Sequence, residues 1–333
     1  MAGLKVLAAK RFVKGRECRV RRDRETVAVF GAGAVGCYFG GMLARSGVSV
    51  TLIGRARHVD AIAAGGLLLK TTTFAERVRV AASTDTAAAR AADLVLVSVK
   101  TWDTEAAARA LAPHLAEGAT VLSLQNGVEN AALLRAGTGH GAFPAVVWVA
   151  AEMTGPGALT HSGRGDLVIG DETPAAPGAP ERRSELDAAA ALFARAGVPC
   201  LVSENVVGEL WAKLAANCAY NAVSALGHAH YARLTATPDR RRLFEEIVGE
   251  VLAVAAASRV DLEGRDVLGD AWRLGTTMAQ ATSSMAQDLA RGRRTEIDAL
   301  NGFVARRGEA LGVPVPVNRT LTTLVKLLEE AGT

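Results

Sequence analysis

The sequence has 333 residues, of which half are apolar and 22% are charged. This composition is typical of a soluble globular protein, and the length predicts about two domains. The net charge of +4 is unevenly placed, because residues 1–25 hold nine of the 38 Lys and Arg but only three of the 34 Asp and Glu. The rest of the chain carries 29 basic and 31 acidic residues, and this balance argues against a nucleic-acid partner.

Residues 1–25 form a basic leader. Its apolar stretch, residues 4–9, is too short for a secretory signal, and Glu17, Asp23 and Glu25 argue against a transit peptide. We expect either a disordered extension or a start site placed too early. No apolar run reaches membrane-spanning length, and the four cysteines lack the C-x-x-C spacing of metal or redox sites. We therefore predict a cytoplasmic protein with reduced thiols, no metal and no membrane partner.

A glycine-rich turn follows the first apolar run of the globular part. Residues 27–30 form a strand pattern that leads into Gly31-Ala32-Gly33-Ala34-Val35-Gly36, which has the G-x-G-x-x-G spacing of dinucleotide-binding turns. The first glycine allows the tight turn, the second lets the backbone approach a pyrophosphate, and the third lets the next helix pack closely. The pyrophosphate then lies on the N-terminus of that helix. The residues predicted to bind the dinucleotide are Gly31, Gly33, Ala34, Val35 and Gly36.

The end of the second strand indicates which dinucleotide is bound. Residues 48–53 form a β-type run that ends in Gly54-Arg55, with Arg57 close by. Chains that bind NAD carry an Asp or Glu here, which accepts hydrogen bonds from the ribose 2′-hydroxyl. A guanidinium instead attracts a 2′-phosphate, so we predict NADP with Arg55 at the phosphate. The alternative is a solvated cation at the strand end.

The first part of the chain alternates strand and helix patterns. Apolar runs at residues 93–99, 120–124 and 145–149 are typical of strands buried on both faces. This alternation predicts a parallel, doubly wound sheet of the Rossmann type. Short strands at residues 158–161 and 167–169, set between glycine-rich segments, predict an antiparallel extension at the sheet edge.

From Ser203 onward no strand pattern recurs, and Ser203 is a candidate N-cap for a long helix over residues 205–226. We therefore predict an NADP-binding domain over residues 26–203 and an all-helical substrate and catalytic domain over residues 204–333. The further helices are expected over residues 239–259, 269–291, 295–311 and 319–330.

Three polar residues interrupt the long helix. Lys213, Asn217 and Asn221 are spaced i, i+4 and i+8, which places them on one face. Their neighbours are small or apolar, and burying an amine with two carboxamides is costly unless they meet polar partners. Spacing alone leaves two interpretations open: a functional stripe, or the solvent-facing stripe of an amphipathic helix.

A second polar cluster lies near the C-terminus. Ser284 and Asp288 are four residues apart on one helical face, and Glu296 opens the next helix, where the dipole favours a carboxylate. On spacing alone, Glu296 also fits a first-turn charge or a partner of the neighbouring arginines.

These motifs together resemble the ketopantoate reductase family, the NADPH-dependent 2-dehydropantoate 2-reductases of pantothenate synthesis. The resemblance spans about residues 27–320, and its last two motifs are far more specific than the glycine turn. The motifs are the glycine turn, Arg55 after the second strand, the strand ending in Lys100, Gln125-Asn126-Gly127, Lys213-x3-Asn217-x3-Asn221, and Ser283-Ser284-Met-x2-Asp288-x7-Glu296-Ile-Asp298-x2-Asn301-Gly302.

The resemblance implies a role for each matching residue. Lys213 is the implied proton donor, and Glu296 assists at the substrate hydroxyl. Lys100 and Asn126 are implied beside the cofactor and the substrate, at strand ends where open sheets bind ligands. The implied substrate-binding residues are Asn126, Asn217, Asn221 and Ser284, with Asp288 supporting the site.

One residue departs from the family pattern. Ala281 stands where family members often have an Asn that contacts substrate, so the preferred 2-oxo acid stays open. The alternatives are a reductase of another branched 2-oxo acid, an opine-type dehydrogenase, and a non-catalytic module that senses NADP. We expect a small-molecule 2-oxo acid as partner, and the sequence leaves the oligomeric state open, with a homodimer as one option.

Overall fold

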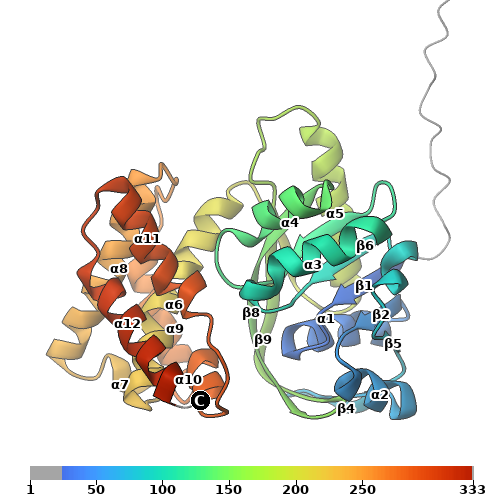
Figure 1. The fold of residues 1–333 in the computed structure, drawn as a ribbon, viewed down its shortest axis with the longest axis horizontal. Coiled ribbons are helices and arrows are strands. Elements are labelled where there is room, and N and C mark those ends of the chain that lie inside the picture. Colours follow the sequence, from blue (N-terminus) through green and yellow to red (C-terminus); the bar gives the residue numbers. More distant parts are fainter. Residues whose placement is uncertain (1–24, 332–333) are drawn as a thin grey trace, which may run out of the picture.

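The protein is described by a computed structural model over residues 25–331 (Figure 1). Figure 1 shows a part built around a sheet beside a bundle of helices. Within the described residues, strands end at Ser203, and every later element is a helix. Our prediction for the leader lies outside the described residues, except for Glu25, whose carboxylate pairs with Arg195.

Ten strands of the described chain form one mixed sheet in the order β4-β3-β9-β8-β7-β6-β1-β2-β5, with β10 beside β9. The strands are β1 (Thr26–Phe30), β2 (Ser49–Ile53), β3 (Leu67–Lys70), β4 (Ala75–Val78), β5 (Ala81–Ser83), β6 (Leu94–Val97), β7 (Thr120–Ser123), β8 (Ala142–Gly155), β9 (Ala158–Gly170) and β10 (Cys200–Ser203). β1 is parallel to both of its neighbours, β2 and β6. The chain thus changes direction across the sheet between β1 and β6, and such a switch point is where open α/β sheets bind ligands.

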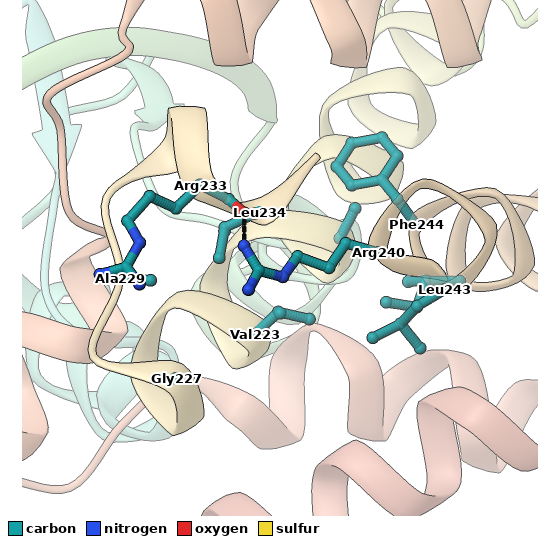
Figure 2. A pocket seen from close by; sticks show the side chains of 10 residues that line it. Val223, Gly227, Ala229, Arg233, Leu234, Arg240, Leu243 and Phe244 are labelled. Atoms are coloured by element: carbon teal, nitrogen blue, oxygen red, sulfur yellow. Dashed lines mark hydrogen bonds between the residues drawn. The ribbon is translucent and has the colours of Figure 1, made fainter. Parts of the chain in front are cut away.

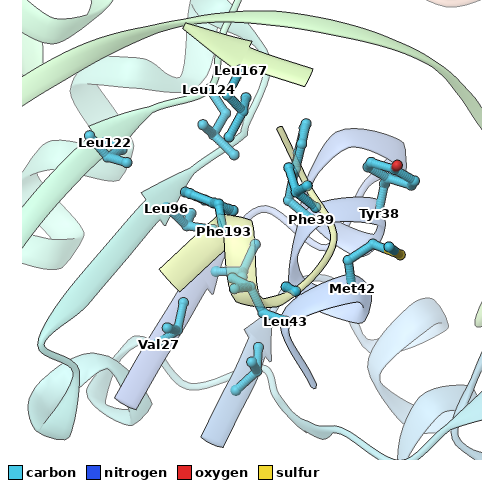
Figure 3. Close-up of a cluster of buried hydrophobic side chains, with 14 of the residues drawn as sticks. Val27, Tyr38, Phe39, Met42, Leu43, Leu96, Leu122, Leu124, Leu167 and Phe193 are labelled. Atoms are coloured by element: carbon cyan, nitrogen blue, oxygen red, sulfur yellow. The ribbon is translucent and has the colours of Figure 1, made fainter. Parts of the chain in front are cut away.

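Helices cover both faces of this sheet, which confirms the predicted doubly wound fold class. They are α1 (Ala34–Arg45), α2 (Ala56–Gly65), α3 (Thr104–Leu111), α4 (Asn130–Thr138) and α5 (Ala179–Arg195). On one face, Phe39 of α1 meets Phe193 of α5 edge to face at 6.0 Å between ring centroids (Figure 3). On the other face, α3 and α4 pack with Val95 and Val97 of β6. β6 is therefore buried on both sides, as its continuous apolar run predicts.

The antiparallel extension is larger than the sequence pattern suggested. β8 runs well beyond the predicted residues 145–149, and the two short strands predicted at residues 158–161 and 167–169 are wrong as separate elements, because they belong to the single strand β9. The pair β8–β9 contains register shifts, one of them between Trp148 and Val149. These irregularities accommodate the glycine-rich segment between the predicted strands as a bulge, where the sequence indicated a turn.

The second part is a bundle around one central helix. Its helices are α6 (Val206–Gly227), α7 (Tyr231–Leu234), α8 (Pro238–Ala257), α9 (Val267–Thr277), α10 (Ser284–Leu289), α11 (Asn301–Leu311) and α12 (Pro316–Ala331). α6 contacts α8, α9, α10 and α12, and it also contacts β8 and β9 of the sheet. Most of its residues are buried, so the helix that carries the polar stripe is the core of the bundle.

Several helix boundaries differ from the prediction. Asn205, and not Ser203, caps α6, because its side-chain oxygen accepts a hydrogen bond from Gly208 N at 2.8 Å. The single helix predicted over residues 269–291 is wrong: α9 ends at Thr277, and Ser283 Oγ caps a separate helix α10 by accepting from Ala286 N.

The helix predicted over residues 295–311 also begins later, at Asn301. Before it lies a short 3-10 helix, Ile297–Ala299, so Glu296 opens that element and not an α-helix. The Glu296 carboxylate accepts a hydrogen bond from the backbone of Thr101 in the sheet part at 3.2 Å. A long-range contact, which the local pattern does not contain, therefore anchors this segment.

Other features of the described residues bear on possible membrane spans, disulfides and metal sites. Across residues 25–331 no helix is long and apolar enough to cross a membrane. Cys37, Cys200 and Cys218 are free thiols, while Cys18 lies outside the described range. No group of three or more His, Cys, Asp or Glu within the same range is arranged to hold a metal ion.

Candidate active site

The glycine turn forms a cradle at the carboxyl end of β1. Gly31 has φ +119°, and a Cβ there would lie 2.7 Å from the backbone carbon of Ser98. A Cβ at Gly36 would overlap the Gly31 carbonyl oxygen, so both positions require glycine. At Gly33 an added Cβ would meet no described atom within 4 Å, so this side of the turn is open.

The open side of the turn is the N-terminus of α1. Gly33 is the N-cap, and no side chain among residues 25–331 caps this end of the helix. The first N–H groups of a helix have no partner within it, and together with the dipole they attract an anion. The cradle therefore fits the pyrophosphate of a dinucleotide, with the backbone of Ala34 and Val35 in the first turn.

Arg55 lies beside this cradle. The carbonyl of Ile53, at the end of β2, accepts hydrogen bonds from Gly31 N at 2.9 Å and Ala32 N at 3.1 Å, which ties the strand end to the turn. Arg55 follows as the N-cap of α2, and both it and Arg57 are exposed. Burial lowers the pKa of His58, and the charges of Arg57 and Arg55 lower it further. This corner of the sheet is thus electropositive and accessible.

The amine of Lys213 bridges the two parts of the molecule. Its Nζ donates to the carbonyl oxygen of Val147 in β8 at 2.6 Å and to Asn126 Oδ1, just after β7, at 3.1 Å. Burial lowers the pKa of Lys213 to about 8; the charge of Glu296 opposes this shift, while that of Arg164 adds to it. The Lys213 side chain therefore faces the sheet, which excludes the solvent-facing interpretation for this residue.

Two buried carboxylates complete this junction. Glu296 accepts hydrogen bonds from Asn126 Nδ2 at 3.2 Å and from Lys100 Nζ at 3.3 Å. Asp288 pairs with Lys100 Nζ at 2.8 Å and with Arg293 at 2.7 Å. Burial alone would lower the pKa of Lys100, but the charges and hydrogen bonds of Glu296 and Asp288 outweigh it, so the pKa is raised. Lys100 is therefore held as a cation between two carboxylates from the helical part.

The remaining predicted substrate residues lie on the adjoining helices. Asn217 and Asn221 continue the α6 stripe, and Ser284 opens α10, which packs against α6 through a hydrogen bond from Ser283 Oγ to the Asn221 carbonyl at 3.1 Å. Within the described part of the chain, the side chains of Asn217, Asn221 and Ser284 form no hydrogen bond with another residue. Their polar groups are therefore available to a ligand, unlike those of the Lys213–Glu296 network.

Sequence reasoning missed three residues that surround Lys213. The ring centroid of Trp148 lies 5.6 Å from Lys213 Nζ and 4.5 Å from the guanidinium carbon of Arg164. Arg164 in turn donates from Nε to Asp166 Oδ1 at 3.0 Å. Trp148 sits in an apolar run and Arg164 in a glycine-rich one, so neither carries a signal in the sequence beyond strand and turn patterns.

A cavity of about 170 Å³ lies elsewhere in the helical part, between α6, α7 and α8 (Figure 2). Its walls are mostly apolar, with Arg233 and Arg240 among them, and Arg240 Nη1 donates to the Arg233 carbonyl at 2.8 Å. None of the predicted site residues lines it. The cavity is therefore separate from the Lys213 network.

Comparison with known proteins decides the family. Residues 27–173 match the family described as ketopantoate reductase PanE/ApbA, and residues 205–329 match the C-terminal domain of the same family. The chain belongs to the ketopantoate reductase family. The 2-dehydropantoate 2-reductase of Halobacterium salinarum is 35% identical to it over 318 residues, which cover 92% of this chain and 99% of that protein. That of Pyrococcus horikoshii is 31% identical over 310 residues, covering 92% and 98%.

Solved structures of this family and of a related dehydrogenase have the same fold. A PanE/ApbA family ketopantoate reductase from Ralstonia eutropha superposes with a TM-score of 0.85 at 51% identity, covering 92% of this chain and 99% of that one. D-mandelate dehydrogenase, solved with NADH and anilino(oxo)acetate, superposes with a TM-score of 0.84 at 25% identity, again covering 92% and 99%.

These similarities confirm the resemblance and the prediction of an enzyme. The chain is an oxidoreductase that acts on CH–OH groups, in a family that depends on NAD or NADP. The alternative of a non-catalytic sensing module is therefore set aside. Because the mandelate dehydrogenase binds NADH, the similarities alone do not decide between the two dinucleotides.

Proposed function

We propose that the protein reduces 2-dehydropantoate to pantoate with NADPH, as a step of pantothenate synthesis. The observation that carries the proposal is the Lys213 amine, bonded at 2.6 Å to the Val147 carbonyl and at 3.1 Å to Asn126 at the junction of the two parts. The substrate is supported by the relatives named 2-dehydropantoate 2-reductase.

The sheet part supplies the residues that would bind the cofactor. The cradle of Gly31, Gly33 and Gly36 with the N-terminus of α1 takes the pyrophosphate, and Arg55 takes the 2′-phosphate. Lys100 and Asn126, at the ends of β6 and β7, lie on the side of the sheet toward Lys213. When bound, the reduced nicotinamide supplies a hydride to the ketone carbon.

The helical part supplies the proton. As the ketone is reduced, negative charge develops on its oxygen, and a positioned ammonium stabilises that charge and donates the proton. An ammonium has three N–H donors, and Lys213 uses two of them on Val147 and Asn126. The third remains for the ketone oxygen, and a pKa of about 8 keeps Lys213 largely protonated near neutral pH while leaving it acidic enough to give up the proton.

The other polar groups orient the substrate. Asn217, Asn221 and Ser284, whose side chains are free of intramolecular hydrogen bonds to described residues, bind the carboxylate and the hydroxyl of the substrate. Glu296 assists at the hydroxyl that forms. Asp288 supports the site by holding Lys100 at 2.8 Å.

The test is an assay of the purified protein with 2-dehydropantoate, followed by the absorbance of the reduced cofactor. We expect consumption of NADPH that depends on the oxo acid, with pantoate as product, and a much lower rate with NADH. Failure to consume either cofactor with any 2-oxo acid would contradict the proposal. Equal rates with both cofactors would contradict only the assignment to NADPH.

A second candidate is the reduction of a different 2-oxo acid. It is favoured by Ala281, by the aromatic ring of Trp148 beside Lys213, and by the similarity to a D-mandelate dehydrogenase. The same assay with 3-methyl-2-oxobutanoate and phenylglyoxylate separates the candidates. The substrate with the highest kcat/KM identifies the preferred reaction.

A further inference from the structure

A strained bulge in β9 lies next to the Lys213 amine. Arg164 has φ +55°, the left-handed region that residues other than glycine rarely adopt, and Gly165 follows with φ +139°. A Cβ at Gly165 would overlap Tyr38 Oη, so α1 passes directly against this strand. Strain of this kind persists only where the surrounding structure enforces it, and it concentrates at functional sites.

The surroundings of the bulge fix its conformation from two sides. The His161 ring hydrogen-bonds through Nε2 to the Arg164 carbonyl, and it stacks on the Tyr38 ring with 4.4 Å between centroids. The register of β8 and β9 shifts at the same place, opposite Trp148. In this conformation the Arg164 side chain stacks on the Trp148 ring, with its guanidinium carbon 4.5 Å from the ring centroid.

The contacts of Arg164 indicate that it supports the Trp148 ring and that its guanidinium is not available to bind an anionic ligand. Both of its side-chain bonds go to one carboxylate, from Nε to Asp166 Oδ1 at 3.0 Å and from Nη2 to Asp166 Oδ2 at 2.6 Å. This fork occupies the Nε–Nη2 edge of the guanidinium and pairs its charge with that of Asp166. What remains is the flat face, which stacks on Trp148 and restricts its movement.

The position of Trp148 relative to Lys213 sets what it touches. In the proposed reaction the ketone oxygen lies about 2.9 Å from Lys213 Nζ. The first atoms of the two groups attached to the ketone carbon then lie within about 5–6 Å of that nitrogen. The Trp148 ring centroid is 5.6 Å from the same nitrogen, so a group of the substrate that lies on the Trp148 side of the amine comes within contact distance of the ring. The negative face of an aromatic ring disfavours the carboxylate and favours the apolar side chain.

We propose that Trp148, held in place by Arg164, is the wall of the substrate site that selects 2-oxo acids with a branched or aromatic side chain over small ones. This rests on the proposed function, which places the ketone oxygen at Lys213. Arg164 is a positioning residue in this arrangement, because it acts through the ring.

The first test is the kinetics of Trp148→Ala and Trp148→Phe with 2-dehydropantoate, phenylglyoxylate and pyruvate. Loss of apolar contact in a binding pocket changes discrimination by about 10–200-fold. We expect kcat/KM of Trp148→Ala to fall at least about tenfold for the two larger substrates, mainly through KM, with little change for pyruvate. Trp148→Phe should restore most of the loss. Trp272→Ala, which removes an exposed tryptophan of α9, is the matched control and should keep the wild-type preference.

The second test is Arg164→Gly, which separates positioning from stability. Glycine adopts a positive φ without strain, so this variant should unfold at a temperature no lower than that of the wild type. It should nevertheless shift substrate preference in the direction of Trp148→Ala. The charged groups that act on Lys213 are Glu296, Asp166 and Arg164, and loss of the Arg164 charge, which lowers the Lys213 pKa, should move the alkaline limb of kcat/KM to higher pH.

The outcomes distinguish this inference from the proposed function. If the wild type reduces no 2-oxo acid, the proposed function is wrong, and the selectivity proposed for Trp148 fails with it. If the wild type is active but Trp148→Ala loses activity equally on all three substrates, or on none, the wall is refuted while the proposed function stands. A fall in thermal stability of Arg164→Gly with an unchanged substrate preference and pH profile would show that Arg164 is only structural.

Discussion

The sheet part and the helical part contribute to the site in different ways. In the sheet part the proposed cofactor cradle is backbone, shaped by Gly31, Gly33 and Gly36, and all of it comes from one continuous strand–turn–helix segment. In the helical part the site is made of side chains, and Lys213 and Glu296 find their hydrogen-bond partners across the junction, on β8 and after β6 and β7. The proposed cofactor site therefore forms locally, whereas the geometry of the proposed catalytic groups depends on how the two parts are joined.

The largest expected effect comes from the helical side. Lys213→Ala removes the proposed proton donor, and general acid catalysis typically contributes about 10²–10⁴-fold, so kcat should fall by that factor. NADPH affinity, measured by fluorescence titration, should be retained, because the cradle belongs to the sheet part. Lys70→Ala, at an exposed position of β3, is the control and should be active. A Lys213→Ala variant with nearly normal kcat would disprove the assignment.

On the sheet side, the corresponding test is the choice of cofactor. Hydrogen bonds to charged groups contribute about 1.5–3 kcal/mol, so Arg55→Ala should reduce the NADPH preference over NADH by about 10–100-fold. The ratio of kcat/KM values for the two cofactors measures it. Arg109→Ala removes an exposed arginine of α3 and serves as the control. An unchanged ratio in Arg55→Ala would mean that this guanidinium does not contact the 2′-phosphate.

Substitutions at two glycines of the turn test whether the backbone forms the cofactor cradle. Gly33→Ala has room in the protein itself, so its melting temperature should be unchanged, while its methyl group meets the pyrophosphate and raises the Kd for NADPH by about tenfold. Gly36→Ala overlaps the Gly31 carbonyl oxygen and approaches Val29 Cγ1 at 2.9 Å, so it should destabilise the fold by about 1–3 kcal/mol. Thermal melts beside cofactor titrations measure both. Similar behaviour of the two variants would argue against the separate roles.

The smallest expected effect is a shift in pH dependence. The negative charge of Glu296 raises the pKa of Lys213, so Glu296→Gln should lower it below about 8. The protonated donor is then lost at a lower pH, and the fall of kcat/KM on the alkaline side should begin earlier than in the wild type. A pH profile of the reduction measures this. A shift to higher pH would contradict the placement of Glu296 beside the amine.

The same contrast explains what the sequence alone could predict. The turn from Gly31 to Gly36 and the stripe from Lys213 to Asn221 depend on spacings within one element, so the sequence alone predicts the turn before α1 and the polar positions of α6. The bulge at Arg164 and the break after Thr277 depend on neighbours that are distant in sequence. In the first case the neighbour is Tyr38, whose ring packs against Gly165 and His161. In the second, backbone N–H groups of residues 231 and 232 donate hydrogen bonds to residues 281 and 279. Local periodicity contains no information about such contacts, so Trp148 was not identified.

The partners of the Lys213 amine have one more consequence. The Val147 carbonyl and the Asn126 amide oxygen are neutral acceptors, and a neutral amine still carries N–H bonds that both can receive. A carboxylate in direct contact with the amine would hold the proton on the amine more firmly. Once the proton was transferred, the negative charge of that carboxylate would have no positive partner. With neutral acceptors, the nitrogen keeps the same orientation whether or not it is charged, so in the proposed reaction the side chain can be reprotonated between turnovers without moving away.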